Sequence, residues 1–294
     1  MSFFSKEKTY RDPIRWQKEL RLAPAYLLLL IWIFFTVVLL GWVVLASFST
    51  TKEIFANKLL ASGFHWENYE KAWVNSDVST IFFNSLFYSL SSVFLLVLVC
   101  APAAYALSRF SFRGNQLMQN AFVASMGVPV VMIVLPLFAM VAGLDILNHV
   151  IPNKLTPIFL YVGINVPYTT IFLMGFFANI SRAFEEAAAI DGCPPGKCFW
   201  QIMLPMAQPG IITVSIFNFI NVWNEYFISL IFGNSDQVRS VAVGLYSMIN
   251  SMKYTGDWAG MFASVIIVFL PTFVLYLFLS ERIIAGVTGG GVKG

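Results

Sequence analysis

Charged side chains are scarce in this sequence: only 11% of its 294 residues are Asp, Glu, Lys or Arg, whereas 58% are hydrophobic. A soluble domain carries about a quarter charged residues, so most of the surface of this chain does not face water. The mean hydropathy of +0.75 agrees. The formal net charge of +3 is small, and we expect no nucleic-acid partner.

Residues that usually carry catalysis or bind metals are also few, with two histidines and three cysteines in the whole chain. His65 and His149 lie in separate predicted connections. Cys193 and Cys198 lack the two-residue spacing and the second ligand pair of a zinc site. The nucleotide-binding pattern Gly-x-x-x-x-Gly-Lys-Ser/Thr does not occur. We therefore expect no catalytic site, no metal and no other cofactor bound by this chain.

Long apolar runs are present instead, and the first of them, Leu22–Ala46, contains no charged residue. A helix needs about 20 apolar residues to cross a bilayer, and backbone groups in lipid must pair internally. Strands of a membrane barrel would alternate apolar and polar residues, which these runs do not. The basic segment before the first run also resembles a secretory signal, but a signal's apolar region has only about 7–15 residues. These runs therefore predict membrane-spanning helices, the first of them uncleaved.

The apolar runs predict an all-α membrane protein with six transmembrane helices in one domain, residues 22–284. A basic arm, residues 1–21, precedes this domain, and a Gly-rich tail, residues 285–294, follows it. Prolines within the third and fourth runs are compatible with spans inside a bundle. The predicted spans are Leu22–Ala46, Ile81–Leu107, Leu117–Ala142, Pro157–Phe177, Ile211–Phe232 and Ala259–Leu279.

The basic residues predict the orientation, because connections that stay in the cytoplasm are enriched in Lys and Arg. With six crossings, twelve of the 18 basic residues fall on the side of the N-terminal arm and six on the other. We therefore expect both termini in the cytoplasm. The segments Ser47–Thr80 and Gly233–Trp258 and the short connection around Asp145 are expected outside.

The largest cytoplasmic connection, residues 178–209, has the features of a docking element. Ser181 followed by Glu185 and Glu186 is typical of a helix N-terminus. Alanines favour a short helix, and Gly192 followed by two prolines would end it. Such a helix would present Glu185, Glu186 and Asp191 beside small residues. A partner surface could approach closely and pair Arg or Lys with these carboxylates.

The same loop resembles a known signature. Glu186-Ala187-Ala188, three residues, Gly192, nine residues and Ile202-x-Leu204-Pro205 match the EAA signature of ATP-binding-cassette (ABC) importer permeases at every defined position. Three other stretches resemble the branch of sugar permeases similar to the smaller subunit of the maltose permease (MalG). They are Ala104–Gly114, Asn221–Tyr226 and Gly286–Gly294. The resemblance extends from about Leu22 to the end of the chain.

This resemblance implies a type I ABC importer permease fold in the cell inner membrane and import of a sugar or oligosaccharide. It implies a second homologous permease subunit, a dimer of cytosolic ATPase that binds ATP and Mg²⁺, and an extracytoplasmic solute-binding protein. The EAA loop would form a coupling helix in a cleft of the ATPase, and the Gly-rich tail would approach the ATPase dimer interface. The implied coupling residues are Glu185, Glu186, Ala187, Ala188, Asp191, Gly192, Leu204 and Pro205.

Glu225 is the only acidic residue within a predicted span, and polar residues recur at helical spacing around it. A polar stripe on an apolar span should face protein or water. In one interpretation it lines a path for a hydroxyl-rich solute, with Trp223 or Tyr226 as a stacking platform. In the other, its side chains bond neighbouring helices. The candidate path residues are Asn218, Asn221, Trp223, Asn224 and Glu225, and the serines Ser85, Ser89 and Ser92 form a possible facing stripe.

Two other classes of function remain as alternatives to an ABC sugar permease. A secondary transporter should show paired repeats and intramembrane ion-coupling groups, and a lone Glu225 without a repeat argues against it. A membrane-embedded enzyme would need a nucleophile–base pair or metal ligands within the bundle. An ABC permease for a solute other than a sugar also stays open.

Overall fold

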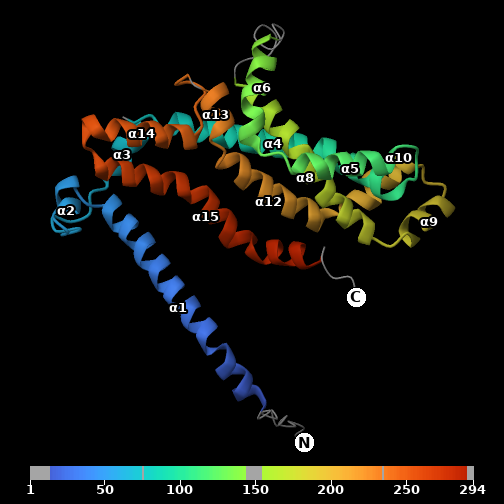
Figure 1. The fold of residues 1–294 in the computed structure, drawn as a ribbon, viewed down its shortest axis with the longest axis horizontal. Coiled ribbons are helices and arrows are strands. Elements are labelled where there is room, and N and C mark those ends of the chain that lie inside the picture. Colours follow the sequence, from blue (N-terminus) through green and yellow to red (C-terminus); the bar gives the residue numbers. More distant parts are fainter. Residues whose placement is uncertain (1–13, 75, 144–153, 234, 290–294) are drawn as a thin grey trace, which may run out of the picture.

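The computed structural model describes residues 14–74, 76–143, 154–233 and 235–289, and every regular element within these ranges is a helix (Figure 1). The N-terminal residues 1–13 and the connection that contains Asp145 and His149 lie outside them. The elements are α1 (Ile14–Ser47), α2 (Thr51–Phe55), α3 (Glu67–Val74), α4 (Val78–Arg109), α5 (Asn115–Met126), α6 (Val130–Gly143), α8 (Thr156–Asn179), α9 (Ala183–Ile190), α10 (Pro195–Cys198), the π-helix η1 (Phe199–Met203), α11 (Leu204–Met206), α12 (Gln208–Trp223), α13 (Phe227–Phe232), α14 (Val241–Thr255) and α15 (Trp258–Gly289).

Six membrane spans fit these helices, which confirms the predicted fold class. Four helices are long and apolar enough to cross a membrane on their own: Leu22–Ser47 of α1, all of α4 and α8, and Trp258–Leu279 of α15. Two bent helix pairs complete the set, α5 with α6 and the segment Pro195–Met206 with α12. At the C-terminal end α15 continues as a helix to Gly289.

The third predicted span is not one straight helix. Instead, α5 and α6 meet at an angle of 104° across residues 127–129. Pro129 lacks a backbone N–H, and its ring disfavours a helical conformation of the preceding Val128. The prediction of a continuous helix Leu117–Ala142 is therefore wrong, because the local backbone chemistry of Pro129 overrides the apolar pattern.

The fifth predicted span, Ile211–Phe232, is also divided. Helix α12 ends at Trp223, and α13 begins only at Phe227. The Glu225 carboxylate accepts hydrogen bonds from the backbone N–H groups of Ile228 (2.9 Å) and Ser229 (3.1 Å), so it satisfies free donors at the start of α13. The expectation that Glu225 belongs to a polar face of one continuous helix is therefore wrong.

The core of the bundle is formed by α4, α8, α12 and α15: α4, α8 and α12 pack against one another, and α15 packs against α12. Helix α1 instead extends away from the rest of the chain (Figure 1) and packs mainly against α15. The Trp42 and Phe262 rings make this contact edge to face, with centroids 5.3 Å apart. None of the most apolar window of α1 is buried within the chain.

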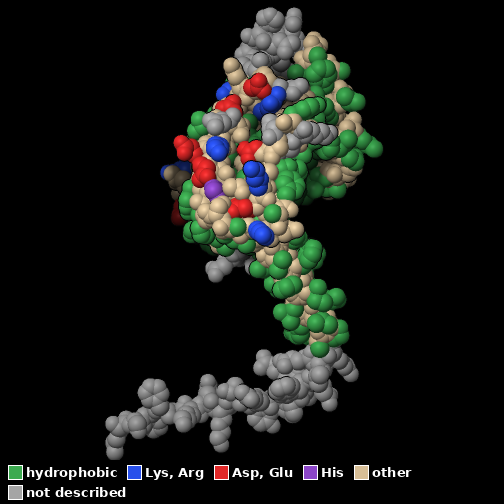
Figure 2. Space-filling view, turned by 90° about the vertical axis from the view of Figure 1, so that its left-hand side faces the viewer, with side chains coloured by type: hydrophobic (Ala, Val, Ile, Leu, Met, Phe, Trp, Pro, Cys, Tyr) green, Lys and Arg blue, Asp and Glu red, His purple; other side chains and the backbone are tan. Residues whose placement is uncertain are grey.

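The two ends of the bundle differ in the elements that cover them. Helices α2, α3 and α14 lie at one end, and α9 and α10 lie at the opposite end (Figure 1). Acidic and basic side chains gather on the end formed by α2, α3 and α14, whereas α1 below it is coated with apolar side chains (Figure 2). The docking loop and the outer segments thus lie on opposite sides of the apolar bundle.

Candidate docking loop and transmembrane groove

The short helix predicted in the docking loop is α9, and local hydrogen bonds define both of its ends. The Arg182 carbonyl accepts bonds from the N–H groups of Glu185 and Glu186, both at 3.0 Å. The two carboxylates lie in the first turn, where the helix dipole favours negative charge. At the other end Cys193 N–H donates to the Ala188 carbonyl at 2.9 Å. This closure requires Gly192 in the left-handed region, with φ of +73°.

The predicted coupling residues divide between two faces of this loop. Glu186, Ala187, Asp191 and Gly192 are exposed, together with Ile190 at 87% and Phe184 at 45%. Glu185 and Ala188 face the bundle, because residues three apart share one side of a helix. Further along the loop Leu204 is half-buried and Pro205 is exposed. The exposed face of α9 is therefore small, apolar and acidic.

Glu185 contacts the end of α4 rather than solvent. Tyr105 Oη donates a hydrogen bond to Glu185 Oε1 at 2.7 Å, and Arg109 Nε lies 3.4 Å from Glu185 Oε2. The Arg109 side chain is only 5% exposed, and its Nη2 also donates to the carbonyl of Ile180, just after α8. Sequence reasoning missed Tyr105 and Arg109 as partners, since its only signal was their place in a stretch that resembles sugar permeases.

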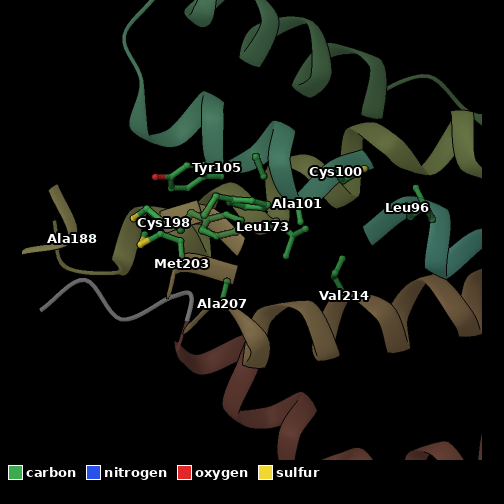
Figure 3. Close-up of a cluster of buried hydrophobic side chains, with 13 residues drawn as sticks. Leu96, Cys100, Ala101, Tyr105, Leu173, Ala188, Cys198, Met203, Ala207 and Val214 are labelled. Carbon is green, nitrogen blue, oxygen red and sulfur yellow. The ribbon is translucent and has the colours of Figure 1, made fainter. Parts of the chain in front are cut away.

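The second half of the loop packs into the bundle. Pro195 prevents continuation of α9 but starts α10, because its missing N–H costs nothing at a first helical position. Cys198, Phe199 and Met203 are buried with Tyr105 at one end of an apolar cluster (Figure 3). The Phe199 ring lies with its centroid 5.1 Å from that of Tyr105. The docking loop is therefore an extension of the core and not a tether.

A polar groove runs along the helices α8 and α12. Its larger part has a volume of about 650 Å³ and is lined by Asn165, Asn218 and Asn221 among apolar residues. A smaller part of about 290 Å³ shares Asn165 and Asn221 and adds Asn224 and Glu225. The bend between α5 and α6 forms one wall, because Met126, Val128 and Val130 line the larger part.

The asparagines of the groove also bond neighbouring helices. Asn218 Nδ2 donates to Thr169 Oγ1 at 2.9 Å, and Asn221 Nδ2 donates to Asn165 Oδ1 at 2.8 Å. The buried Asn218 Oδ1 accepts no hydrogen bond from the described residues. The two interpretations of the polar stripe are therefore compatible, since the same amides join α12 to α8 and line the groove.

Trp223 does not line this groove. Its side chain is 1% exposed, its ring stacks on Phe219 with centroids 5.7 Å apart, and its Nε1 donates to the Val268 carbonyl of α15 at 3.2 Å. Tyr168 and Phe217 line the larger part of the groove instead, and Tyr226 lines the smaller part. The serines Ser85, Ser89 and Ser92 are buried packing residues, and Ser85 Oγ accepts a bond from Val241 N–H at 2.8 Å.

No group of three or more His, Cys, Asp or Glu side chains in the described ranges is placed to hold a metal ion. The features that remain are an apolar bundle, a polar groove between two of its bent segments, and an exposed docking helix at one end. Together they describe a helical multi-span membrane protein with a groove inside its bundle and an exposed short helix at one end.

The chain belongs to the family described as binding-protein-dependent transport system inner membrane component, whose model matches residues 98–287. It is 33% identical to the diacetylchitobiose uptake system permease protein NgcG of Streptomyces coelicolor over 91% of this chain and 88% of that protein. It is 28% identical to the trehalose transport system permease protein SugB of Mycobacterium tuberculosis over 86% and 90%.

The fold is shared with a bacterial ABC transporter involved in the import of the acidic polysaccharide alginate. The TM-score is 0.75 at 20% identity, over 96% of this chain and 99% of that one. The predicted type I ABC importer permease fold is therefore confirmed.

Proposed function

We propose that this chain is the transmembrane permease subunit of an ABC importer for a sugar or oligosaccharide delivered by an extracytoplasmic solute-binding protein. The observation that carries the proposal is the exposed face of α9, where Glu186 and Gly192 of the EAA signature stand free on a helix anchored to the core. Relatives named for diacetylchitobiose and trehalose transport support a carbohydrate substrate.

The exposed face of α9 would sit in a cleft of a cytosolic ATPase. Ala187 and Gly192 allow close approach, Ile190 offers apolar area, and Glu186 and Asp191 offer partners for Arg or Lys. Under this proposal ATP and Mg²⁺ bind to a dimer of that ATPase and not to this chain. The loop would then face the cytoplasm together with both chain termini.

The groove between α8 and α12 would carry the solute. Asn218, Asn221, Asn224 and Glu225 offer donors and acceptors that suit hydroxyl groups. Tyr168 and Phe217 provide aromatic surface on which an apolar sugar face can pack. Trp223 has a different part in this proposal, since it holds α12 against α15.

The remaining partners follow from what the chain leaves uncovered. A second homologous permease would complete the translocation path and cover part of α1. The solute-binding protein would dock on the opposite end, where α2 and α3 carry charged side chains (Figure 2). With the docking loop in the cytoplasm, the chain would be an inner-membrane protein whose outer segments face this binding protein.

The test of the proposed class is co-purification of the assembled importer in mild detergent. An ATPase should co-purify with the unmodified chain, and its hydrolysis rate should rise when a sugar-loaded binding protein is added. Stimulation only by a binding protein loaded with another kind of solute would overturn the carbohydrate assignment. Absence of any associated ATPase under stabilising conditions would overturn the class.

The sharper test of the docking face is the double substitution Glu186→Lys and Gly192→Asp. It places a like charge against the expected basic partner and a side chain at a left-handed backbone position. We expect loss of ATPase association while membrane insertion is retained, as measured by co-purification and membrane fractionation. A matched control is Gln116→Lys on the exposed face of α5, which should leave association unchanged.

A further inference from the structure

Glu185 of α9 contacts two residues at the C-terminal end of α4. Tyr105 and Arg109 are one turn apart on α4. Tyr105 Oη donates a hydrogen bond to Glu185 Oε1 at 2.7 Å, and Arg109 Nε forms an ion pair with Glu185 Oε2 at 3.4 Å without a hydrogen bond. Arg109 at the same time donates to the carbonyl of Ile180, which joins α8 to α9. The Glu185 carboxylate therefore links α9 to α4, and Arg109 links α4 to the residue that follows α8.

The same contact excludes Glu185 from the exposed docking face. Consecutive residues on a helix point about 100° apart, so Glu186 faces outward and Glu185 faces the core. The Arg109 side chain is 5% exposed and that of Glu185 is 21% exposed. A buried charge that loses its partner raises the free energy of the protein strongly. If Glu185 moved away alone, the buried Arg109 would lose its partner, so we expect the two residues to move together.

The contact extends from α4 into the rest of the core through the Tyr105 ring. This ring packs against Phe177 of α8, with centroids 5.5 Å apart, and against Phe199 of η1, at 5.1 Å. Cys198 and Met203 lie beside it (Figure 3). Beyond η1 the chain continues into α12, which lines the groove.

We propose that Tyr105, Arg109 and Glu185 form a clamp that transmits displacement of α9 to α4, and through the Tyr105 ring to α8 and η1. The clamp rests on the proposed function, since it presupposes that an ATPase moves α9. In this proposal Glu185 is a positioning residue that links α9 to α4, whereas Glu186 on the exposed face of α9 contacts the ATPase. A purely structural staple would stabilise the loop without affecting how ATP hydrolysis and uptake are coupled.

The test uses the assembled importer in proteoliposomes and measures solute uptake per ATP hydrolysed. Glu185→Gln removes the charge but keeps a carbonyl oxygen that Tyr105 can still donate to. We expect this variant to retain its ATPase on co-purification and to lose coupling by at least fivefold, the lower end of the range of about 5–150-fold for coupling between two sites. Glu186→Gln is the matched control and should weaken ATPase association instead.

Tyr105→Phe is a milder variant that keeps the ring packing and removes only the hydroxyl. It should reduce uptake per ATP in the same direction, and the double variant with Glu185→Ala should lose no more than Glu185→Ala alone, because alanine already removes the acceptor of the Tyr105 hydrogen bond. An unchanged ratio in Glu185→Gln, or additive losses in the double variant, would overturn the clamp. Loss of ATPase association in Glu185→Gln would assign Glu185 to docking and overturn it as well.

These outcomes are separate from failure of the proposed function itself. If the unmodified chain binds no ATPase, the class is wrong and the coupling ratio is undefined. If it binds an ATPase and imports solute, the ratio decides the clamp alone.

Discussion

Single side chains in this protein take their roles from the direction in which they point. Glu185 and Glu186 are neighbours of the same type, yet one is held by Tyr105 and Arg109 and the other is exposed. Trp223 and Asn224 are also neighbours, but Trp223 packs against α15 while Asn224 lines the groove. At the residue scale, the role of a side chain therefore depends on the direction in which it points, which differs between neighbouring positions.

The groove residues give a prediction at the same scale. Asn221→Ala together with Glu225→Gln should reduce solute uptake about tenfold or more, because under the proposed function the solute loses a hydrogen bond of about 0.5–1.5 kcal/mol to each of these side chains. Glutamine keeps one of the two oxygens that accept N–H groups at the start of α13, so the fold should persist. The measurement is uptake into proteoliposomes at a matched amount of complex.

Asn120→Ala is the control for this pair, since Asn120 lies exposed on α5 outside the groove. It should leave uptake unchanged. Uptake by the paired variant at the unmodified rate would show that these side chains only join helices.

At the scale of elements, the bends and close approaches of helices shape the groove. Helix α12 reaches α8 closely because Gly210 has no side chain. A Cβ added there would lie 2.3 Å from Cγ of Phe176, which is closer than any real contact. The inner atoms of a ring cannot move aside cheaply, so the two helices would have to separate.

Gly210→Ala is therefore expected to lower the free energy of unfolding by about 1–3 kcal/mol. Thermal unfolding of the purified complex in detergent measures the change. Gly175→Ala is the matched control on α8, because an added Cβ there meets nothing within 4 Å. It should leave stability unchanged or raise it by up to about 1 kcal/mol, since alanine favours a helix over glycine. Equal effects at the two positions would contradict the close-approach argument.

The short helix α2 and the segment after it are held by one carboxylate. Glu53 accepts bonds from the Ser62 hydroxyl and N–H, both at 2.6 Å, and from Thr50 N–H at 2.8 Å. Hydrogen bonds lower the pKa of Glu53 from 4.5 to about 2. The bond from the Ser62 side chain has the largest effect, and the bond from the Thr50 backbone has the next largest. These bonds favour the charged form, so they weaken when the group is protonated.

The sign of the pH dependence follows from this lowered pKa. The ionised Glu53 stabilises the segment fully above about pH 4.5, and this contribution is lost as the pH falls toward about 2. Hydrogen exchange of residues 50–65, corrected for the intrinsic effect of pH, should therefore speed up over this window. Glu53→Gln should show faster exchange already at neutral pH and no further loss of protection on acidification. Identical pH profiles for both proteins would contradict the assignment.

For the whole molecule, the arrangement of α1 is the main clue to assembly. Most of its apolar surface is uncovered by the rest of the chain, although its end contacts Phe262 through Trp42. Under the proposed function, a second permease would cover part of this surface.

This arrangement predicts a contact that can be tested in the assembled importer. A photo-crosslinking amino acid placed at Phe34, which is 71% exposed on α1, should form an adduct with the second permease subunit. The reason is the proposed assembly, in which the second permease lies against the part of α1 that this chain leaves uncovered. The adduct is measured by mass spectrometry. Adducts with lipid alone, while the complex stays intact, would contradict the prediction.

The sequence was sufficient for those features that depend on length and local pattern. Apolar runs of about 20 residues located the spans, and the acidic first turn with Gly192 located α9, because a bilayer and a helix end impose their requirements on consecutive residues. The helix has no side-chain cap at its start, so the Ser181 signal did not mark its first residue. The same patterns failed at Pro129 and between Trp223 and Phe227, where an apolar run concealed a break in the helix.

Only the tertiary structure decided which side chains meet. Tyr105 and Glu185 are 80 positions apart, and Asn221 and Asn165 are 56 apart, so no local period relates them. It also placed Trp223 against α15 and opened the groove beside Asn218. The direction of a side chain depends on the helix that packs against it, and this packing is settled only when the whole bundle buries its surfaces together.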